Sequence, residues 1–356
     1  CHAAEHVNGI RLYRKTGVPL TFENGLDKIA LISRRIKPGR SRAPGQSESL
    51  NVMEDYRSYM MKFAQKIKPM KVVLDGSNGI AGEVIPYVFG KLPVELICNH
   101  CEPDGRSEFL GRRFPPSEVE SGLEKQVVSR GAQLGMAVDF DGDICAFCDE
   151  QGGMLRNDVV AALISRELLS RVPGARIAFD LRFTAAVREE ILDAGGQPLR
   201  SRADPLALAQ ATRQKEAIYG ADMMGRHFFR DMYGSESPVL ALVLLCSLVS
   251  RTERPLSALA DEVRRYSHSG DVRYDLPSSK AVEQVMQEVK AEFPEAERDT
   301  LDGLTMRFPN WWFNLRQPSG SASLRLSVEG RTQGQERRGR QMLERIIQKY
   351  QAKQSA

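Results

Sequence analysis

Apolar residues recur at two different spacings along the chain, and the changes of spacing predict alternating helices and strands. Helical spacing covers residues 50–67, and Pro69 ends that helix just before a short apolar run at 72–74. The same order then repeats: strands at 94–97 and 134–138, helices at 117–130 and 158–170. Alternation of this kind is typical of a largely parallel sheet covered by helices.

A second α/β unit of similar size follows: a strand at 176–179 and helices at 184–194, 206–214 and 238–250. From about residue 266 the pattern changes to helices with a few antiparallel strands: helices at 280–293 and 335–351, strands at 304–308, 312–315 and 324–328. We therefore predict α/β domains at 69–171 and 172–265 and a smaller α+β domain at 266–356, all preceded by the segment 1–68.

The first segment holds a turn signal at Asn8-Gly9 and short mixed runs as far as Ile36, and residues 37–49 are rich in Pro, Gly, Ser and Arg. We interpret residues 37–49 as an exposed linker. The chain starts at Cys1 without a methionine or a leader pattern, so we expect a missing front part.

Length and composition narrow the class of protein. A chain of 356 residues exceeds one compact core, and 50 basic against 46 acidic residues, scattered along the chain, argue against nucleic acid as a partner. The longest apolar run, residues 239–249, is too short to span a membrane. Six cysteines in so long a chain are typical of reduced thiols in a cytoplasmic protein.

The most specific local pattern is Asp139-Phe140-Asp141-Gly142-Asp143, directly after the predicted strand 134–138. Asp139, Asp141 and Asp143 supply three hard oxygen ligands of the kind that Mg²⁺ prefers. An acidic turn or a calcium-type loop would produce the same local pattern.

In its context, this loop resembles the metal loop of the phosphohexomutase family, which reads Asp-Gly-Asp-x-Asp-Arg. Other segments resemble the family in the right order: 71–82, Pro103-Asp104-Gly105, 149–152, 217–231, Asp302-Gly303-Leu304 and 313–316. The resemblance implies a multidomain architecture of three mixed-sheet α/β domains and a fourth, different domain around a cleft. It also implies that most of the first domain is absent, with residues 1–68 as its remnant and linker.

The reaction that the resemblance implies is the movement of a phosphoryl group between two oxygens of mannose or glucose phosphate. It uses Mg²⁺ and a phosphoserine, whose position Cys1 occupies here, followed by His2. Arg11 stands in place of the family's lysine, and a guanidinium is a poor proton shuttle. Ile144 replaces the arginine that normally follows the metal ligands.

The substrate positions are altered as well. The family's sugar loop, Gly-Glu-x-Ser-Gly-His, corresponds to residues 221–226, where Asp222 is shorter than glutamate, Met224 cannot donate a hydrogen bond and Arg226 replaces histidine. Arg182 matches the family upstream. For the distal phosphate loop the matching positions are Arg316, Ser319, Ser321 and Arg325, which either form a residual anion site or an ordinary hairpin turn.

These departures predict a phosphohexomutase-family chain that is impaired or inactive as an intramolecular phosphotransferase. The alternatives are a non-catalytic relative, which binds a sugar phosphate or a protein, and a gene fragment. A missing first domain would expose apolar surface on the second domain, so we expect a protein partner there.

Two Cys-x-x-Cys pairs, Cys98 with Cys101 and Cys145 with Cys148, have a spacing that could supply four thiolates to zinc. The second pair lies on an expected strand, where residues three apart point to opposite faces. We therefore interpret all four as small buried cysteines. Trp311-Trp312 is read as core or domain interface.

Overall fold

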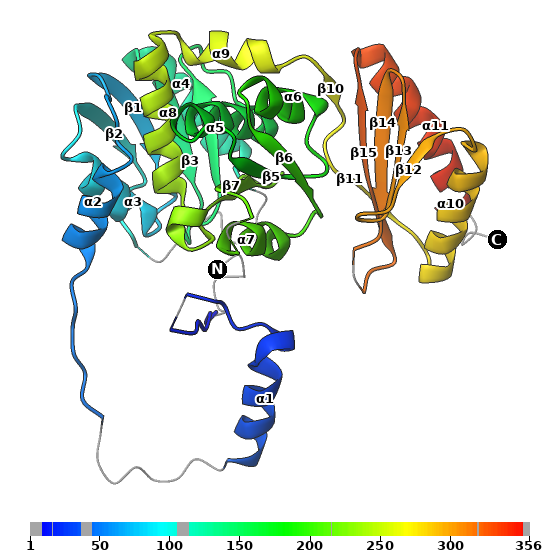
Figure 1. Cartoon of the computed structure of the whole chain (residues 1–356), viewed down its shortest axis with the longest axis horizontal. Coiled ribbons are helices and arrows are strands. Elements are labelled where there is room, and N and C mark those ends of the chain that lie inside the picture. The colour runs from blue at the N-terminus through cyan, green and yellow to red at the C-terminus, as the bar shows by residue number, and fades with distance from the viewer. Residues whose placement is uncertain are drawn as a thin grey trace.

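The computed structural model describes residues 9–15, 17–36, 45–104, 114–214, 216–318 and 320–351. Its α/β units lie together as one body, and the last domain stands beside them with its helices on the far side (Figure 1).

The first α/β unit is built on a four-stranded sheet in the order β2-β1-β3-β4. Its strands are β1 (Met70–Asp75), β2 (Val94–Asn99), β3 (Leu134–Val138) and β4 (Cys145–Asp149). The β1 strand pairs in parallel with β2 and β3, whereas β4 returns antiparallel to β3. The central β3 is buried at every position, because α4 (Ser117–Arg130) packs on one face and the other face belongs to the main hydrophobic core, to which α3 (Ala81–Phe89) also contributes.

The second unit repeats this plan with the sheet β6-β5-β7-β8-β9. Its strands are β5 (Arg176–Asp180), β6 (Gln197–Ser201), β7 (Tyr219–Ala221), β8 (His227–Phe229) and β9 (Ser235–Glu236), and its helices include α6 (Ala185–Asp193), α7 (Pro205–Arg213) and α9 (Leu256–Val263). The first three strands are parallel, and β8 and β9 are antiparallel. Both sheets are therefore mixed rather than largely parallel.

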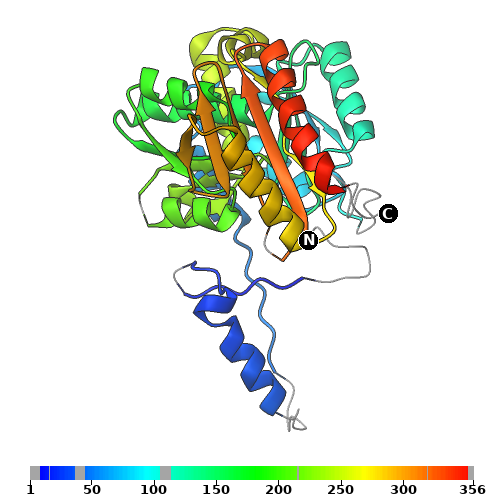
Figure 2. The same cartoon turned by 90° about the vertical axis from the view of Figure 1, so that its right-hand side faces the viewer.

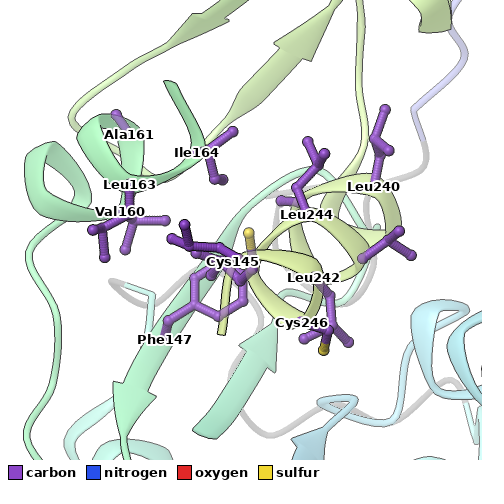
Figure 3. Close-up of a cluster of buried hydrophobic side chains, with 14 of the residues drawn as sticks. Cys145, Phe147, Val160, Ala161, Leu163, Ile164, Leu240, Leu242, Leu244 and Cys246 are labelled. Carbon is purple, nitrogen blue, oxygen red and sulfur yellow. The ribbon is translucent and has the colours of Figure 1, made fainter. Parts of the chain in front are cut away.

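Two helices join these units through one hydrophobic core, α5 (Asn157–Arg171) and α8 (Pro238–Thr252). The α8 helix is buried continuously from Pro238 to Ser250, which explains why it lacks a polar face. Figure 3 shows Leu240, Leu244 and Cys246 of α8 beside Cys145 of β4, with α5 across the cluster. No helix in the described part of the chain is long and apolar enough to cross a membrane.

The last domain has a separate core and an antiparallel sheet in the order β10-β15-β14-β13-β12, with β11 also paired to β15. The strands are β10 (Ser267–His268), β11 (Val272–Asp275), β12 (Glu297–Asp299), β13 (Leu304–Phe308), β14 (Trp311–Arg316) and β15 (Ser323–Gly330). The helices α10 (Ser279–Glu292) and α11 (Gln333–Gln351) cover one face (Figure 2). The other face carries polar side chains and faces the second α/β unit (Figure 1).

The N-terminal segment differs from the expected mixed runs, because it contains a short 3-10 turn, η1 (Phe22–Asn24), and the helix α1 (Leu26–Arg35). The α1 helix has no buried residue and stands away from the main body (Figure 1). The helix expected at 50–67 is shorter, since α2 (Met53–Met61) ends before two successive turns at residues 62 and 63. Trp311 and Trp312 take the expected places: Trp311 stacks on Phe308 beside the core, and Trp312 lies near His268 at the edge of the domain.

Candidate functional site

The acidic loop connects β3 to β4, as the sequence predicts. Asp139 is 5% exposed, and its Oδ1 accepts the backbone N–H groups of Asp143 and Ile144 at 2.9 and 2.8 Å. Gly142 has a φ of +75°, a conformation that glycine adopts without strain, and it closes the turn by donating to the Asp139 carbonyl at 3.1 Å. The loop therefore has a rigid backbone that fixes the direction of each carboxylate.

Asp139 and Asp141 converge, because their side chains share a hydrogen bond. Burial, followed by the neighbouring Asp141 carboxyl, raises the pKa of Asp139 to about 7. Two carboxylates held together in a buried loop repel each other when both are ionised, and a divalent cation would relieve that repulsion. These two side chains fit a hard cation by their chemistry and their direction.

The third aspartate is engaged differently: Asp143 Oδ2 accepts a hydrogen bond from Arg11 Nη2 at 2.8 Å. Within the described ranges, no three His, Cys, Asp or Glu side chains are grouped closely enough to hold one metal ion. The fit to Mg²⁺ is therefore partial in this conformation, with two carboxylates converging and the third paired to Arg11.

Arg11 also faces Glu236 on β9, a half-buried residue that the sequence analysis missed. Burial raises the pKa of Glu236, and the nearby Asp143 raises it further, whereas Arg11 and Arg226 lower it. These contacts connect the N-terminal segment, the acidic loop and the second α/β unit into one cluster of charges. Glu236 belongs to a two-residue strand, which leaves no pattern that sequence reasoning can detect.

The acidic loop and the sugar-loop position lie in direct contact. Cys145, the first residue of β4, donates its backbone N–H to the carbonyl of Gly225 at 3.0 Å. Gly225 has a φ of +92°, and a Cβ there would lie 2.3 Å from the Cys145 carbonyl oxygen. Only glycine fits at 225, so the fold brings two motifs that are distant in sequence into one site.

At the sugar-loop position, residues 221–226, the Asp222 carboxylate is hydrogen-bonded to groups within the same loop. Asp222 is 2% exposed, and its Oδ1 accepts the backbone N–H groups of Met224 and Arg226 at 2.9 and 3.0 Å. Its Oδ2 accepts from Arg226 Nη1 at 3.2 Å. Burial raises the pKa of Asp222, and Arg226 opposes that effect. The side chain of Met224 is exposed.

Arg182 and Arg316 meet at a single carboxylate, Asp271. Arg182 Nη1 donates to Asp271 Oδ2 at 2.9 Å, and Arg316 Nη2 donates to the same oxygen at 2.8 Å. Asp180 holds the other side of Arg182 and also accepts the Met223 N–H at 3.3 Å, which links this network to the sugar-loop position. Asp180 and Asp271 are both absent from the sequence prediction.

A row of three arginines crosses the open face of the last sheet. Arg325 on β15 lies directly opposite Arg316 on β14 and Arg273 on β11. Side chains directly opposite across strands share a face about 5 Å apart, and like charges in such pairs repel. Arg316 pairs with Asp271 and Arg273 with Asp275, whereas half-buried Arg325 has no ion pair among the described residues.

Ser321, close to this row, shares a hydrogen bond with the hydroxyl of Ser323 at 2.8 Å. The remaining predicted positions Cys1, His2 and Ser319 lie outside the described residues. The described members thus fall into two groups: Arg11, the three aspartates, Asp222 and Arg226 in one, and Arg182, Arg316, Arg325 and Ser321 in the other. The Met223–Asp180 bond joins the groups.

A cavity of about 330 Å³ opens beside both groups. Met223 and Met224 line it from the sugar-loop position, Arg156 and Asp158 from the start of α5, and His268 from β10. It lies between the α/β units and the last domain, and ligand sites often occur at such boundaries between domains.

The two cysteine pairs do not form one site. The sheet order β2-β1-β3-β4 places Cys98 and Cys101 at one edge and Cys145 and Cys148 at the other, which is about 14 Å away at the usual strand spacing. The interpretation of all four as buried is wrong for the first pair, because Cys98 is exposed at the end of an edge strand and Cys101 is half-buried. It holds for Cys145 and Cys148.

Family models match two consecutive parts of the chain. The phosphoglucomutase/phosphomannomutase alpha/beta/alpha domain II matches residues 54–153, and domain III of the same family matches residues 156–266. These ranges follow the two α/β units and together cover more than half of the 356 residues.

Whole-chain comparisons give the same result. A phosphomannomutase from Salmonella typhimurium is 29% identical over 343 residues, covering 93% of this chain and 74% of the relative. The structure of a phosphoglucomutase/phosphomannomutase family protein from Burkholderia thailandensis superposes with a TM-score of 0.78 at 23% identity, over 92% of this chain and 70% of that one. The structure of an N-acetylphosphoglucosamine mutase from Aspergillus fumigatus, in complex with GlcNAc-6P and magnesium, superposes with a TM-score of 0.60 at 10% identity. The match covers 84% of this chain and 65% of that one.

Proposed function

Because the chain belongs to the phosphoglucomutase/phosphomannomutase family of phosphohexomutases, we propose that it binds a hexose phosphate and transfers the phosphoryl group only weakly. The substrate class is a mannose or glucose phosphate, and the reaction is the family's intramolecular phosphoryl transfer. The retained part of the function is binding at the arginine row. The impaired part is recognition of the sugar and catalysis.

The closed sugar-loop position supports the impairment. Both oxygens of the Asp222 carboxylate are used within the loop, on two backbone N–H groups and on Arg226. A carboxylate that reads a sugar must offer an oxygen to a hydroxyl group. Here the sugar hydroxyl would have to displace the charged side chain of Arg226, which is only 15% exposed. Groups within the loop therefore compete with the substrate for the Asp222 carboxylate.

The arginine row supports the binding. Arg325 presents a guanidinium without an ion pair among the described residues, and the Nε of Arg316 is buried without a hydrogen-bond partner there. Guanidinium groups bind phosphate oxygens by charge-assisted hydrogen bonds in fixed geometry. A phosphate between Arg316 and Arg325 would also cancel the repulsion of the cross-strand pair.

Mg²⁺ belongs to this proposal as the cation of the acidic loop. Asp139 and Asp141 would hold it, with Asp143 joining once Arg11 has moved. When bound, the ion would neutralise negative charge on the phosphoryl group. The magnesium in the Aspergillus fumigatus enzyme supports the assignment by fold similarity. Ile144, which is 4% exposed and apolar, contributes no phosphate contact next to this loop.

The test is a titration of the whole chain with mannose 1-phosphate and glucose 1-phosphate, followed by the fluorescence of its two tryptophans, which neighbour the arginine row on β14. Arg325→Ala should weaken binding about 10- to 100-fold, since a hydrogen bond to a charged group contributes about 1.5–3 kcal/mol. Arg345→Ala is the matched control, because Arg345 is exposed on α11, which covers the opposite face of the sheet. Equal affinities for the two variants would contradict the proposed site.

Catalysis is measured in a coupled assay with Mg²⁺ and a hexose 1,6-bisphosphate activator, with Asp141→Ala as the control. We expect little or no turnover. Turnover at the level of an active phosphomannomutase, abolished by Asp141→Ala, would overturn the proposed impairment while leaving the phosphate site intact.

A protein partner is the second candidate, and the exposed apolar side chains support it. Ile80 and Val128 on the first α/β unit are 51% and 56% exposed, and on α1 Leu31 and Ile32 are 51% and 54% exposed. Burial of such side chains against a partner would favour association. A monodisperse monomer in light scattering would count against this candidate. We also propose a cytoplasmic location, with which the free cysteines of the described residues accord.

A further inference from the structure

The turn that follows β2 brings two cysteines together. Cys98 is the penultimate residue of the strand, and the strand ends at Asn99. His100 has a φ of +47°, which reverses the chain immediately before Cys101. In an extended strand, residues three apart would be about 10 Å apart, but the turn at His100 brings the two thiols close enough to interact.

The contact between the two thiols shifts their pKa values in opposite directions. The hydrogen bond from Cys101 lowers the pKa of Cys98 to about 7, against the opposing effect of burial. The pKa of Cys101 is raised by the same hydrogen bond, by burial and by the charges of Cys98 and Asp75. An exposed cysteine with a thiolate fraction at neutral pH is the reactive kind, and a second thiol beside it can resolve an oxidised intermediate.

The other Cys-x-x-Cys pair provides a contrast within the same molecule. Cys145 and Cys148 lie on the regular strand β4 and belong to different hydrophobic clusters on its two faces. Their thiols donate to the carbonyls of Gly225 and Asp149 instead of to each other. Burial raises the pKa of both, that of Cys148 to about 12. Sequence spacing alone therefore does not distinguish a reactive pair from an inert one.

We propose that Cys98 and Cys101 form a redox-active dithiol, which a hydroperoxide oxidises to a disulfide within the turn. The Cys98 thiolate attacks the terminal oxygen of the peroxide, the O–O bond breaks, and the leaving oxygen takes a proton to form water or an alcohol. Cys98 becomes a sulfenic acid. The Cys101 sulfur then attacks the Cys98 sulfur, so that the S–S bond forms and the S–O bond breaks. The departing hydroxide takes the proton of the Cys101 thiol and leaves as water. Two thiols are oxidised and one peroxide is reduced.

The turn is fastened to the loop after β1. Asn78 donates its backbone N–H to the His100 carbonyl at 2.7 Å, and Gly76 donates to the Asn99 carbonyl at 3.0 Å. At Gly82 the two segments touch so closely that a Cβ would lie 2.5 Å from the Cα and carbonyl oxygen of Cys101. A change in the cysteine turn therefore displaces the loop at 76–82.

The loop at 76–82 in turn touches the acidic loop. A Cβ on Gly79 would lie 2.1 Å from the carbonyl oxygen of Phe140. Because close-packed segments move together, the oxidation state of the cysteines is linked to the conformation of residues 139–144. Oxidation of the two cysteines would therefore change the conformation of the candidate metal loop.

Peptide mapping after peroxide treatment tests the proposal on the whole chain. Trypsin releases the two cysteine pairs in separate peptides, residues 92–106 and 131–156. We expect peptide 92–106 to lose two hydrogen atoms in mass and to resist alkylation until dithiothreitol restores it. Before oxidation, Cys98 should react with iodoacetamide in the folded protein at least about 10-fold faster than Cys148.

Two variants make the outcome decisive. Cys101→Ser removes the resolving thiol, so peroxide should leave a sulfenic acid on Cys98 that dimedone traps. Cys148→Ser is the matched control and should still form the disulfide. Equal alkylation rates of Cys98 and Cys148, or peroxide treatment that yields no disulfide in peptide 92–106, would overturn the proposed dithiol.

Hydrogen exchange tests the linkage between the cysteines and the acidic loop. The exchange of peptide 131–156 should change on oxidation in the wild type and not in Cys101→Ser. Unchanged exchange in the oxidised wild type would overturn the linkage.

Discussion

Asp271 holds two arginines from different domains, and its replacement by asparagine is the sharpest test of that network. Asparagine keeps the shape of the side chain but removes the negative charge that Arg182 and Arg316 share through bonds of 2.9 and 2.8 Å. The variant would leave two neighbouring guanidinium groups facing each other with only a neutral acceptor between them. We expect it to weaken the attachment of the last domain to the second α/β unit.

The size of the effect follows from the burial of the three side chains. Arg182 is 6%, Arg316 13% and Asp271 19% exposed, so water screens the network only in part. Removing one partner of a buried ion pair costs about 3–5 kcal/mol. Asp180 continues to neutralise Arg182, and the amide oxygen still accepts one bond. We therefore expect a loss of about 2–3 kcal/mol in the free energy of unfolding of the last domain.

Urea unfolding measures this loss, since both tryptophans of the chain, Trp311 and Trp312, lie in the last domain. Asp275→Asn is the control, because Asp275 pairs with Arg273 at 70% and 54% exposure. An exposed pair contributes at most about 1 kcal/mol, so the control should cost about 0.5 kcal/mol or less. A cost for Asp271→Asn no larger than for Asp275→Asn would refute the reasoning.

Three further predictions concern pH, the sugar-loop position and the cation. Burial raises the pKa of Glu329 to about 7, whereas a glutamate in the unfolded chain has a pKa of about 4.3. The free energy of unfolding of the wild type should therefore fall by up to about 3 kcal/mol between about pH 4.5 and 7. Glu329→Gln should remove this fall, and the same pH dependence of unfolding in the variant and the wild type would contradict the prediction. Met224→Ser combined with Arg226→His should raise turnover at least about 10-fold in the coupled assay by releasing Asp222, and unchanged turnover would place the defect elsewhere. Arg11→Ala should tighten Mg²⁺ binding about 2- to 5-fold by calorimetry, because Asp143 loses its partner; weaker binding would show that Arg11 does not compete.

Long helices with strong apolar spacing and clear ends could be predicted from the sequence. The helix at 117–130 matches α4, since Pro116 precedes its first turn and Gly131, with a φ of +60°, ends it. Apolar spacing alone does not predict α3, because this helix contains Pro86 and begins among glycines that are typical of turns. Strands of two or three residues, such as β9, are too short for any periodicity.

The site was predictable where the chemistry is local in sequence. The acidic loop combines alternate carboxylates with a preceding buried strand, and both features are visible in a few residues. Asp271 lies 89 positions from Arg182, and only the docking of two domains makes them partners. The exposure of Cys98 likewise depends on β2 being the edge strand of its sheet, which no residue near Cys98 indicates.

The α8 helix makes the two α/β units inseparable in folding. Its side chains from Pro238 to Ser250 fill a core to which both sheets contribute, so neither sheet has a complete interior of its own. A chain divided between residues 153 and 156, where the two family domains meet, would expose this interior on both fragments. We expect the two units to melt in one cooperative transition, whereas the last domain has its own core and can unfold separately from them.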